Sequence, residues 1–184
     1  MNIPNALTLF RISLIPIFVL FFYLPVEWRY SGSAIIFMLA AITDWFDGYL
    51  ARKLEQVSAL GEFLDPVADK LIVAVALVLL VQAHATIWIS IPASIIISRE
   101  IVISALREWM AELGKRRKVA VSYVGKLKTV GQMVAIILLL SQNPEVKPFG
   151  FIMWLGYLLM YVASFLTLWS MIVYLRAAWN EFFI

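Results

Sequence analysis

The sequence predicts an all-α integral membrane protein, a bundle of six transmembrane helices. Apolar residues make up 63% of the 184 residues and charged residues only 15%, whereas soluble domains are nearer half apolar and a quarter charged. Apolar stretches of roughly 20 residues, long enough to cross a bilayer, recur along the chain. No segment shows the alternating pattern of a transmembrane β-strand. Lipid is therefore the expected solvent for most of the surface.

Six stretches are predicted to cross the bilayer in turn. The first contains Arg11 and is not followed by a small-residue cleavage site, so we predict a retained helix rather than a cleaved signal. The others follow closely, with no long linker and no internal repeat, so a single domain over residues 1–184 is expected. The predicted spans are 6–24, 31–51, 61–83, 86–110, 124–142 and 149–175.

The basic residues predict the orientation. With six spans, Lys and Arg concentrate on one side, including the run 115–118, and the opposite loops hold little more than Arg29 and Lys147. The positive-inside rule then places both termini in the cytoplasm. His84 falls in a loop on the far side and is expected to be solvated.

The aspartates give the sharpest functional signal. The chain has four, Asp44, Asp47, Asp65 and Asp69, all near the junction of the second and third spans. At 3.6 residues per turn the first two lie about 60° apart on one helix and the last two about 40° apart on the next. A short turn makes these helices antiparallel neighbours, so the two pairs are expected to converge.

Four carboxylates in so small a volume need compensating charge. The chain has no cysteine, and oxygen ligands favour Mg²⁺, Mn²⁺ or Ca²⁺. Two divalent ions would balance the charge, and such a pair suits displacement at phosphorus. Helix caps or a solvated turn are the alternative, but charges inside apolar spans are costly and usually functional. We therefore expect a polar, metal-binding cavity on the cytoplasmic side.

Small residues continue the acidic stripes. Gly48 and Ala51 follow Asp44 on its helical face, Arg52 ends that stripe, and Gly61 precedes Asp65 by one turn. Small side chains would leave a groove for a ribose or base, and Arg52 is placed to meet a phosphate. The alternative is close helix packing, for which membrane helices also use small residues.

These residues resemble a family signature. The segment Asp44-x-x-Asp47-Gly48-x-x-Ala51-Arg52, eight further residues, then Gly61-x-x-x-Asp65-x-x-x-Asp69 is similar to the motif of the CDP-alcohol phosphotransferases. The resemblance implies transfer of a phosphoryl-linked group from a CDP-linked substrate to an alcohol. It implies that the four aspartates hold two divalent cations, Mg²⁺ or Mn²⁺, that Asp69 is the catalytic base, and that Gly48, Ala51, Arg52 and Gly61 line the CDP site.

Segments 2–11 and 125–132 resemble the branch of that family that joins CDP-diacylglycerol to sn-glycerol 3-phosphate. An acceptor that is a dianion needs cations, and Arg and Lys are its expected partners. The candidates are Arg99, Arg107, Lys126 and Lys128. Structural ion pairs with nearby glutamates, or lysines snorkelling to the interface, are the alternatives. Transfer to phosphatidylglycerol, as in cardiolipin synthases, is the competing activity.

Asn5, Thr8 and Arg11 form a polar stripe on the first span. It is expected either to contact the lipid headgroup or to mark a helix at the membrane interface. An ion-coupled transporter is the competing class of function, because buried carboxylates also mark ion pathways. The halves of the chain do not repeat, however, and the aspartates gather at one side. We expect membrane lipids but no nucleic acid as partners, and the family resemblance makes a homodimer a possible assembly.

Overall fold

In a computed structural model, the described residues are 3–53, 58–114, 123–146 and 148–179, and they form an all-helical bundle without strands. Every predicted span is confirmed as a helix. The predicted and observed helix ends differ by at most three residues, at the start of the first helix and at the end of the last helix. The helices are α1 (Ile3–Phe22), α2 (Arg29–Lys53), α3 (Ala59–His84), α4 (Ile87–Glu112), α5 (Tyr123–Leu140) and α6 (Phe151–Ala178).

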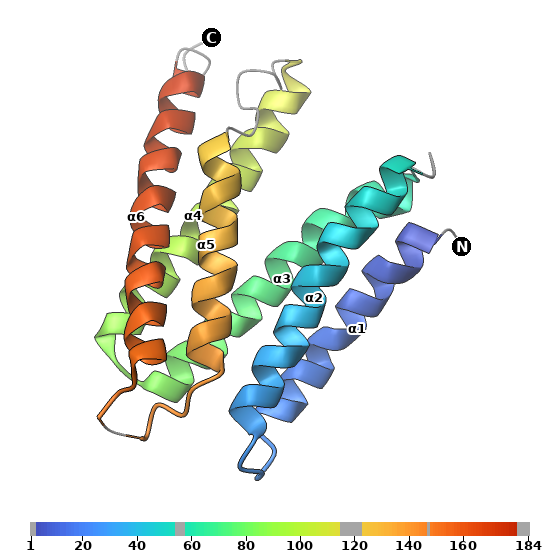
Figure 1. The fold of residues 1–184 in the computed structure, drawn as a ribbon. Coiled ribbons are helices and arrows are strands. Elements are labelled where there is room, and N and C mark those ends of the chain that lie inside the picture. Colours follow the sequence, from blue (N-terminus) through green and yellow to red (C-terminus); the bar gives the residue numbers. More distant parts are fainter. Residues whose placement is uncertain (1–2, 54–57, 115–122, 147, 180–184) are drawn as a thin grey trace.

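The six helices form two groups that diverge toward one end of the molecule. Figure 1 shows α1, α2 and α3 side by side in one group and α4, α5 and α6 in the other. The most extensive helix contacts are between α5 and α6 and between α1 and α2. The start of α1 and the end of α6 both lie at the diverging end, as an even number of spans requires.

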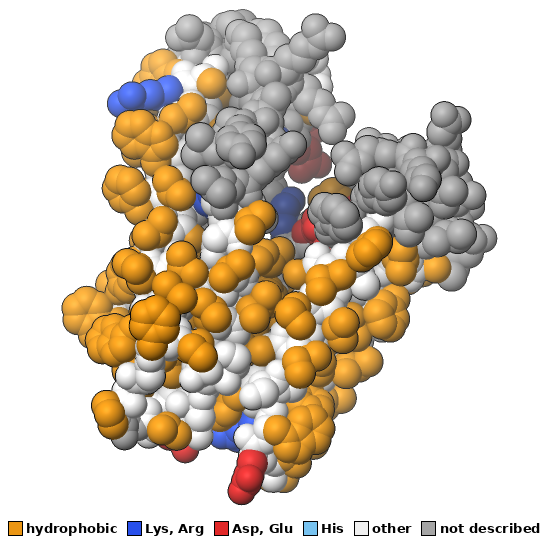
Figure 2. Space-filling view, viewed as in Figure 1, with side chains coloured by type: hydrophobic (Ala, Val, Ile, Leu, Met, Phe, Trp, Pro, Cys, Tyr) orange, Lys and Arg blue, Asp and Glu red, His pale blue; other side chains and the backbone are white. Residues whose placement is uncertain are grey.

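The surface is that of a membrane protein. Three helices, α1 over Asn5–Phe22, α4 and α6, are long and apolar enough to cross a bilayer by length and composition. Large apolar side chains such as Leu20, Phe151 and Phe165 are exposed, and hydrophobic side chains cover most of the face seen in Figure 2. Such extensive apolar exposure would be a liability in water and is expected against lipid.

Apolar packing holds the two groups together away from the diverging end. The main cluster includes Phe18, Phe37, Leu77, Ile96 and Ile136, all with no more than traces of exposed surface. On α3 these core positions follow the aspartates along the chain. The closed part of the bundle is therefore apolar, and the polar residues of α3 lie where the helices separate.

The prediction for His84 was wrong. The residue ends α3 and is buried, with its Nδ1 atom 2.7 Å from the hydroxyl oxygen of Tyr157 on α6. The two rings also meet edge to face, with centroids 5.4 Å apart. Sequence position placed His84 in the loop after the third span and did not show that an aromatic residue of α6 covers it.

The contact between α5 and α6 depends on a small residue at position 156. A Cβ atom on Gly156 would lie 2.9 Å from Cγ and Cδ2 of Leu139, a buried residue of α5. We predict that Gly156→Ala destabilises the protein by about 1–3 kcal/mol, because overpacking forces the helices apart. Thermal unfolding in detergent measures this. Gly131→Ala, on the same pair of helices but with nothing within 4 Å of the new Cβ, is the control and is expected to be neutral or slightly stabilising.

Candidate active site

A charged cavity of about 500 Å³ lies between the two groups of helices. Figure 2 shows acidic and basic side chains inside a hollow of an otherwise largely apolar surface. Five helices contribute to its walls. The charged residues that line it are Asp44 of α2, Asp65, Asp69 and Lys70 of α3, Arg99, Glu100 and Arg107 of α4, and Lys128 of α5, and Tyr174 of α6 adds a hydroxyl group.

Arg11 joins three helices beside this cavity. Its side chain has 0% of its surface exposed, and its Nη1 atom donates to Oδ1 of Asp44 at 2.7 Å and to Oδ1 of Asp69. The guanidinium of α1 therefore links α2 to α3. Charge-assisted hydrogen bonds of this kind are stronger than neutral ones, so Arg11 fixes the separation of the two carboxylates.

The rest of the α1 stripe faces the same way. Thr8 Oγ1 donates to Asp65 Oδ1 at 2.6 Å, and Ser58 Oγ donates to Asn5 Oδ1 at 2.8 Å. Ser58 caps α3 by accepting from the backbone N–H of Gly61 at 3.1 Å. The three-residue spacing on α1 thus matches successive polar groups of α2 and α3, and the stripe packs inside the protein. Its predicted contact with the lipid headgroup stays a prediction.

Gly61 lies where α1 approaches α3 closely. A Cβ at this position would be 2.7 Å from Asn5 Oδ1. Close helix packing, which the sequence offered as an alternative, therefore accounts for this glycine. Its predicted part in the CDP site remains a prediction. Asp47, Gly48, Ala51 and Arg52 of α2 and Lys126 of α5 lie on the expected helices, but their side chains fall outside the described part of the structure.

The opposite wall is basic. Arg99 is 7% exposed and Lys128 is 3% exposed, and both donate to Glu100 Oε1, at 2.8 Å and 3.3 Å. Arg107 donates from Nη2 to the Tyr174 hydroxyl at 3.2 Å. The structure brings together these three predicted phosphate-binding residues. It also shows one of the structural ion pairs that the sequence left open, because Glu100 partly neutralises Arg99.

The basic wall keeps hydrogen-bonding capacity for a ligand. Among the described residues, the Nε atoms of Arg99 and Arg107 are buried and have no hydrogen-bond partner. A buried donor without a partner is costly, so a ligand that brings acceptor oxygens into the cavity would relieve that cost. Sequence reasoning offered Glu100 as an ion-pair partner of Arg99 but missed that Glu100 also accepts from Lys128.

The acidic wall has the donor chemistry for a hard divalent cation. Asp44, Asp65 and Asp69 all line the cavity, and carboxylate oxygens are the ligand type that Mg²⁺ and Mn²⁺ prefer. Within the described residues no three acidic or histidine side chains converge closely enough to hold a metal ion. Asp44 and Asp69 instead share the positive charge of Arg11. A metal ion bound by Asp44 and Asp69 would therefore share these carboxylates with Arg11 or displace it.

The fold and the cavity define a class, an α-helical membrane protein whose opposed acidic and basic walls suit a phosphorylated ligand. The family model for CDP-alcohol phosphatidyltransferases matches residues 1–169, and the chain belongs to this family of transferases. Members of the family generally use divalent metal ions.

Curated relatives match nearly the whole chain. It is 57% identical over 180 residues to the CDP-diacylglycerol–glycerol-3-phosphate 3-phosphatidyltransferase of Pseudomonas fluorescens, covering 97% of this chain and 91% of the relative. It is 56% identical over 177 residues to the proteins of the same name from Escherichia coli K12 and Shigella flexneri, covering 96% of this chain and 94% of each relative.

Removal of Arg11 should destabilise the diverging end. In Arg11→Ala the carboxylates of Asp44 and Asp69 lose their shared donor, and we expect a loss of about 1–3 kcal/mol. Divalent cations should then raise the melting temperature more in the variant than in the parent, because they replace the missing charge. Thermal unfolding in detergent, with and without Mg²⁺, measures both effects.

Arg176→Ala is the matched control, because Arg176 is an exposed arginine near the end of α6. We expect its melting temperature and its response to Mg²⁺ to equal those of the parent. Equal melting behaviour of Arg11→Ala and the parent would contradict the structural role of Arg11.

Proposed function

We propose that the protein transfers the phosphatidyl group of CDP-diacylglycerol to sn-glycerol 3-phosphate, giving phosphatidylglycerophosphate and CMP. The observation that carries the proposal is one cavity with carboxylates on α2 and α3 opposite arginine and lysine on α4 and α5. Relatives named for this reaction, 56–57% identical over nearly the whole chain, support it.

The basic wall is the proposed site of the acceptor's phosphate. Glycerol 3-phosphate is a dianion, and the guanidinium groups of Arg99 and Arg107 offer planar sets of donors that match phosphate oxygens. Lys128 adds a positive charge, and Lys126 lies one helical half-turn away on α5. A neutral alcohol as acceptor would leave these cations without a purpose in the reaction.

The acidic wall is the proposed site of two divalent cations, Mg²⁺ or Mn²⁺, held by Asp44, Asp47, Asp65 and Asp69. When bound, such ions neutralise the pyrophosphate and stabilise the charge that develops during displacement at phosphorus. Gly48, Ala51, Arg52 and Gly61 are proposed to line the CDP site. Thr8 and Arg11 hold the aspartates in place, and the stripe that they form with Asn5 is proposed to lie beside the lipid headgroup.

In the proposed reaction, Asp69 is the general base. Its carboxylate takes the proton of the acceptor's primary hydroxyl while Arg99, Arg107 and Lys128 orient the phosphate. The hydroxyl oxygen attacks the phosphorus that carries the diacylglycerol, a new P–O bond forms, and the bond to the CMP phosphate breaks. Positioning and preorganised charge supply most of the acceleration.

The proposed setting is the bacterial inner membrane, with one domain over residues 1–184. The cavity and both termini would face the cytoplasm. Support comes from the excess of Lys and Arg in the segments on that side and from the common end shared by the start of α1 and the end of α6.

The direct test is release of CMP by the purified protein in detergent. With CDP-diacylglycerol and Mg²⁺, we expect release only when glycerol 3-phosphate is added, and we expect chelation of the metal to abolish it. Turnover with phosphatidylglycerol but not with glycerol 3-phosphate would instead assign the cardiolipin synthase activity. No turnover with either acceptor would contradict the proposal.

The role of Asp69 is tested by Asp69→Asn, which keeps the shape and removes the base. We expect activity to fall by about 10²–10⁴-fold, the usual contribution of a general base. Glu108→Gln, the same kind of change at an exposed position of α4, should keep full activity. An Asp69→Asn protein that folds, binds metal and retains the parent's rate would refute the assignment.

A further inference from the structure

Glu100 is an acidic residue in the basic wall of the charged cavity. Its Oε1 atom accepts from Nη1 of Arg99 at 2.8 Å and from Nζ of Lys128 at 3.3 Å. The side chains of these two cations are nearly buried, whereas the side chain of Glu100 keeps 31% of its surface exposed. Because Glu100 lines the cavity, a ligand in the cavity can reach its carboxylate.

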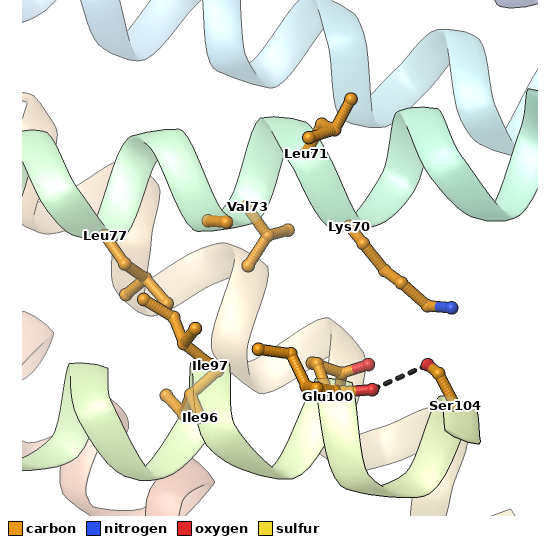
Figure 3. Close-up of a pocket in the computed structure, with 10 residues that line it drawn as sticks. Lys70, Leu71, Val73, Leu77, Ile96, Ile97, Glu100 and Ser104 are labelled. Carbon is orange, nitrogen blue, oxygen red and sulfur yellow. Dashed lines mark hydrogen bonds between the residues drawn. The ribbon is translucent and has the colours of Figure 1, made fainter. Parts of the chain in front are cut away.

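The second carboxylate oxygen of Glu100 has room for a further hydrogen bond. In the described part of the chain, no group donates to its Oε2 atom. Figure 3 shows Glu100 and Ser104 on α4 opposite Lys70 on α3, with the Ser104 hydroxyl bonded to an oxygen of Glu100. That oxygen is the backbone carbonyl, which accepts at 2.6 Å. The Oε2 atom is therefore left as an acceptor for a donor that the ligand brings.

The charge of the basic wall decides which kind of donor this is. Three positive groups, those of Arg99, Arg107 and Lys128, and the one carboxylate of Glu100 give the wall a formal charge of +2. Like charges repel, so a further cation is disfavoured there, and a phosphate is favoured beside the three cations. A neutral hydroxyl group of the same phosphorylated ligand can donate to Oε2 without either conflict.

We propose that Glu100 is a specificity-determining residue that accepts a hydrogen bond from the secondary hydroxyl of the acceptor, on the carbon next to the phosphate-bearing carbon. This inference rests on the proposed function, because it requires sn-glycerol 3-phosphate in the cavity. The cations that hold the phosphate also hold Oε1 of Glu100, so the hydroxyl nearest to the phosphate is the one within reach of Oε2. A purely structural role in pairing Arg99 with Lys128 is the alternative, and it uses Oε1 alone.

The acceptor is then fixed at three points. Its phosphate binds Arg99, Arg107 and Lys128, its secondary hydroxyl binds Glu100, and its primary hydroxyl is left to reach Asp69 on the opposite wall. Three contacts define the orientation of a small molecule, and correct orientation is a large part of catalysis. Glu100 thereby keeps the secondary hydroxyl away from the reacting phosphorus and directs transfer to the primary hydroxyl.

The acceptor analogue 3-hydroxypropyl phosphate tests the proposal, because it keeps the phosphate and the primary hydroxyl and lacks only the secondary hydroxyl. The measurement is kcat/KM for sn-glycerol 3-phosphate divided by kcat/KM for the analogue, with CDP-diacylglycerol and Mg²⁺ present. For the parent we expect this acceptor ratio to be about 10–100, the usual contribution of a hydrogen bond to a charged group expressed as a ratio of rates.

Glu100→Gln is the test variant. Its amide oxygen would accept from Arg99 and Lys128, which leaves the NH₂ group to face the ligand. An NH₂ group donates and does not accept, so we expect the acceptor ratio to fall toward 1. The added positive charge of the wall acts on both phosphates alike and cancels in the ratio. Glu108→Gln, the same change at an exposed position of α4 outside the cavity, should keep the parent's ratio.

An acceptor ratio near 1 in the parent, or a parent-like ratio in Glu100→Gln, would overturn the proposal. If Glu100→Gln turned over neither acceptor, isothermal titration would compare the Kd values of the two phosphates, and a parent-like ratio of these values would also overturn it. If the variant did not fold, Glu100→Asp would keep the charge but withdraw the carboxylate from the ligand. Its acceptor ratio should again fall, and a parent-like ratio would contradict the proposal. A parent without turnover of sn-glycerol 3-phosphate would instead refute the proposed function.

Discussion

Charges placed between apolar helices must be compensated inside the protein, and the contact of Arg11 with two aspartates is where this constraint acts most strongly. The arginine has no exposed surface, and its partners lie on two different helices. Burying a charge is tolerable only with such partners. The contact therefore dictates how α1, α2 and α3 meet at the diverging end, while apolar packing sets the rest of the bundle.

The remaining charges are sorted by helix. Aspartates lie on α2 and α3, and most of the basic groups lie on α4 and α5. Glu100 is the exception on the basic wall, and its Oε1 atom accepts from both Arg99 and Lys128. It lowers the repulsion between these two cations and holds them in one place. Two substrates, one with a pyrophosphate and one with a phosphate, would therefore meet carboxylate oxygens that can bind metal ions on one wall of the cavity. On the opposite wall they would meet hydrogen-bond donors of arginine and lysine.

Much of this arrangement follows from the sequence. Helix number and limits follow from the length of the apolar stretches, and the shared faces of Asp65 and Asp69 follow from helical spacing. The sequence does not predict which residues bind Arg11, because a polar stripe on one helix does not show which neighbouring helix the stripe contacts. Burial of His84 and the bridging position of Glu100 depend in the same way on contacts between distant helices. The separation of the two helix groups creates the cavity, and no repeating pattern of residues in the sequence predicts that separation.

Carboxylates of α2 and α3 are proposed to hold divalent cations at the wall of the cavity opposite Arg99 and Lys128. Anomalous scattering from crystals of the protein soaked with Mn²⁺ tests it most directly. We expect an anomalous peak within bonding distance of carboxylate oxygens from both Asp44 on α2 and Asp65 or Asp69 on α3. Absence of a peak between these helices, with Asp44 and Asp69 still bound to Arg11 at saturating Mn²⁺, would contradict it.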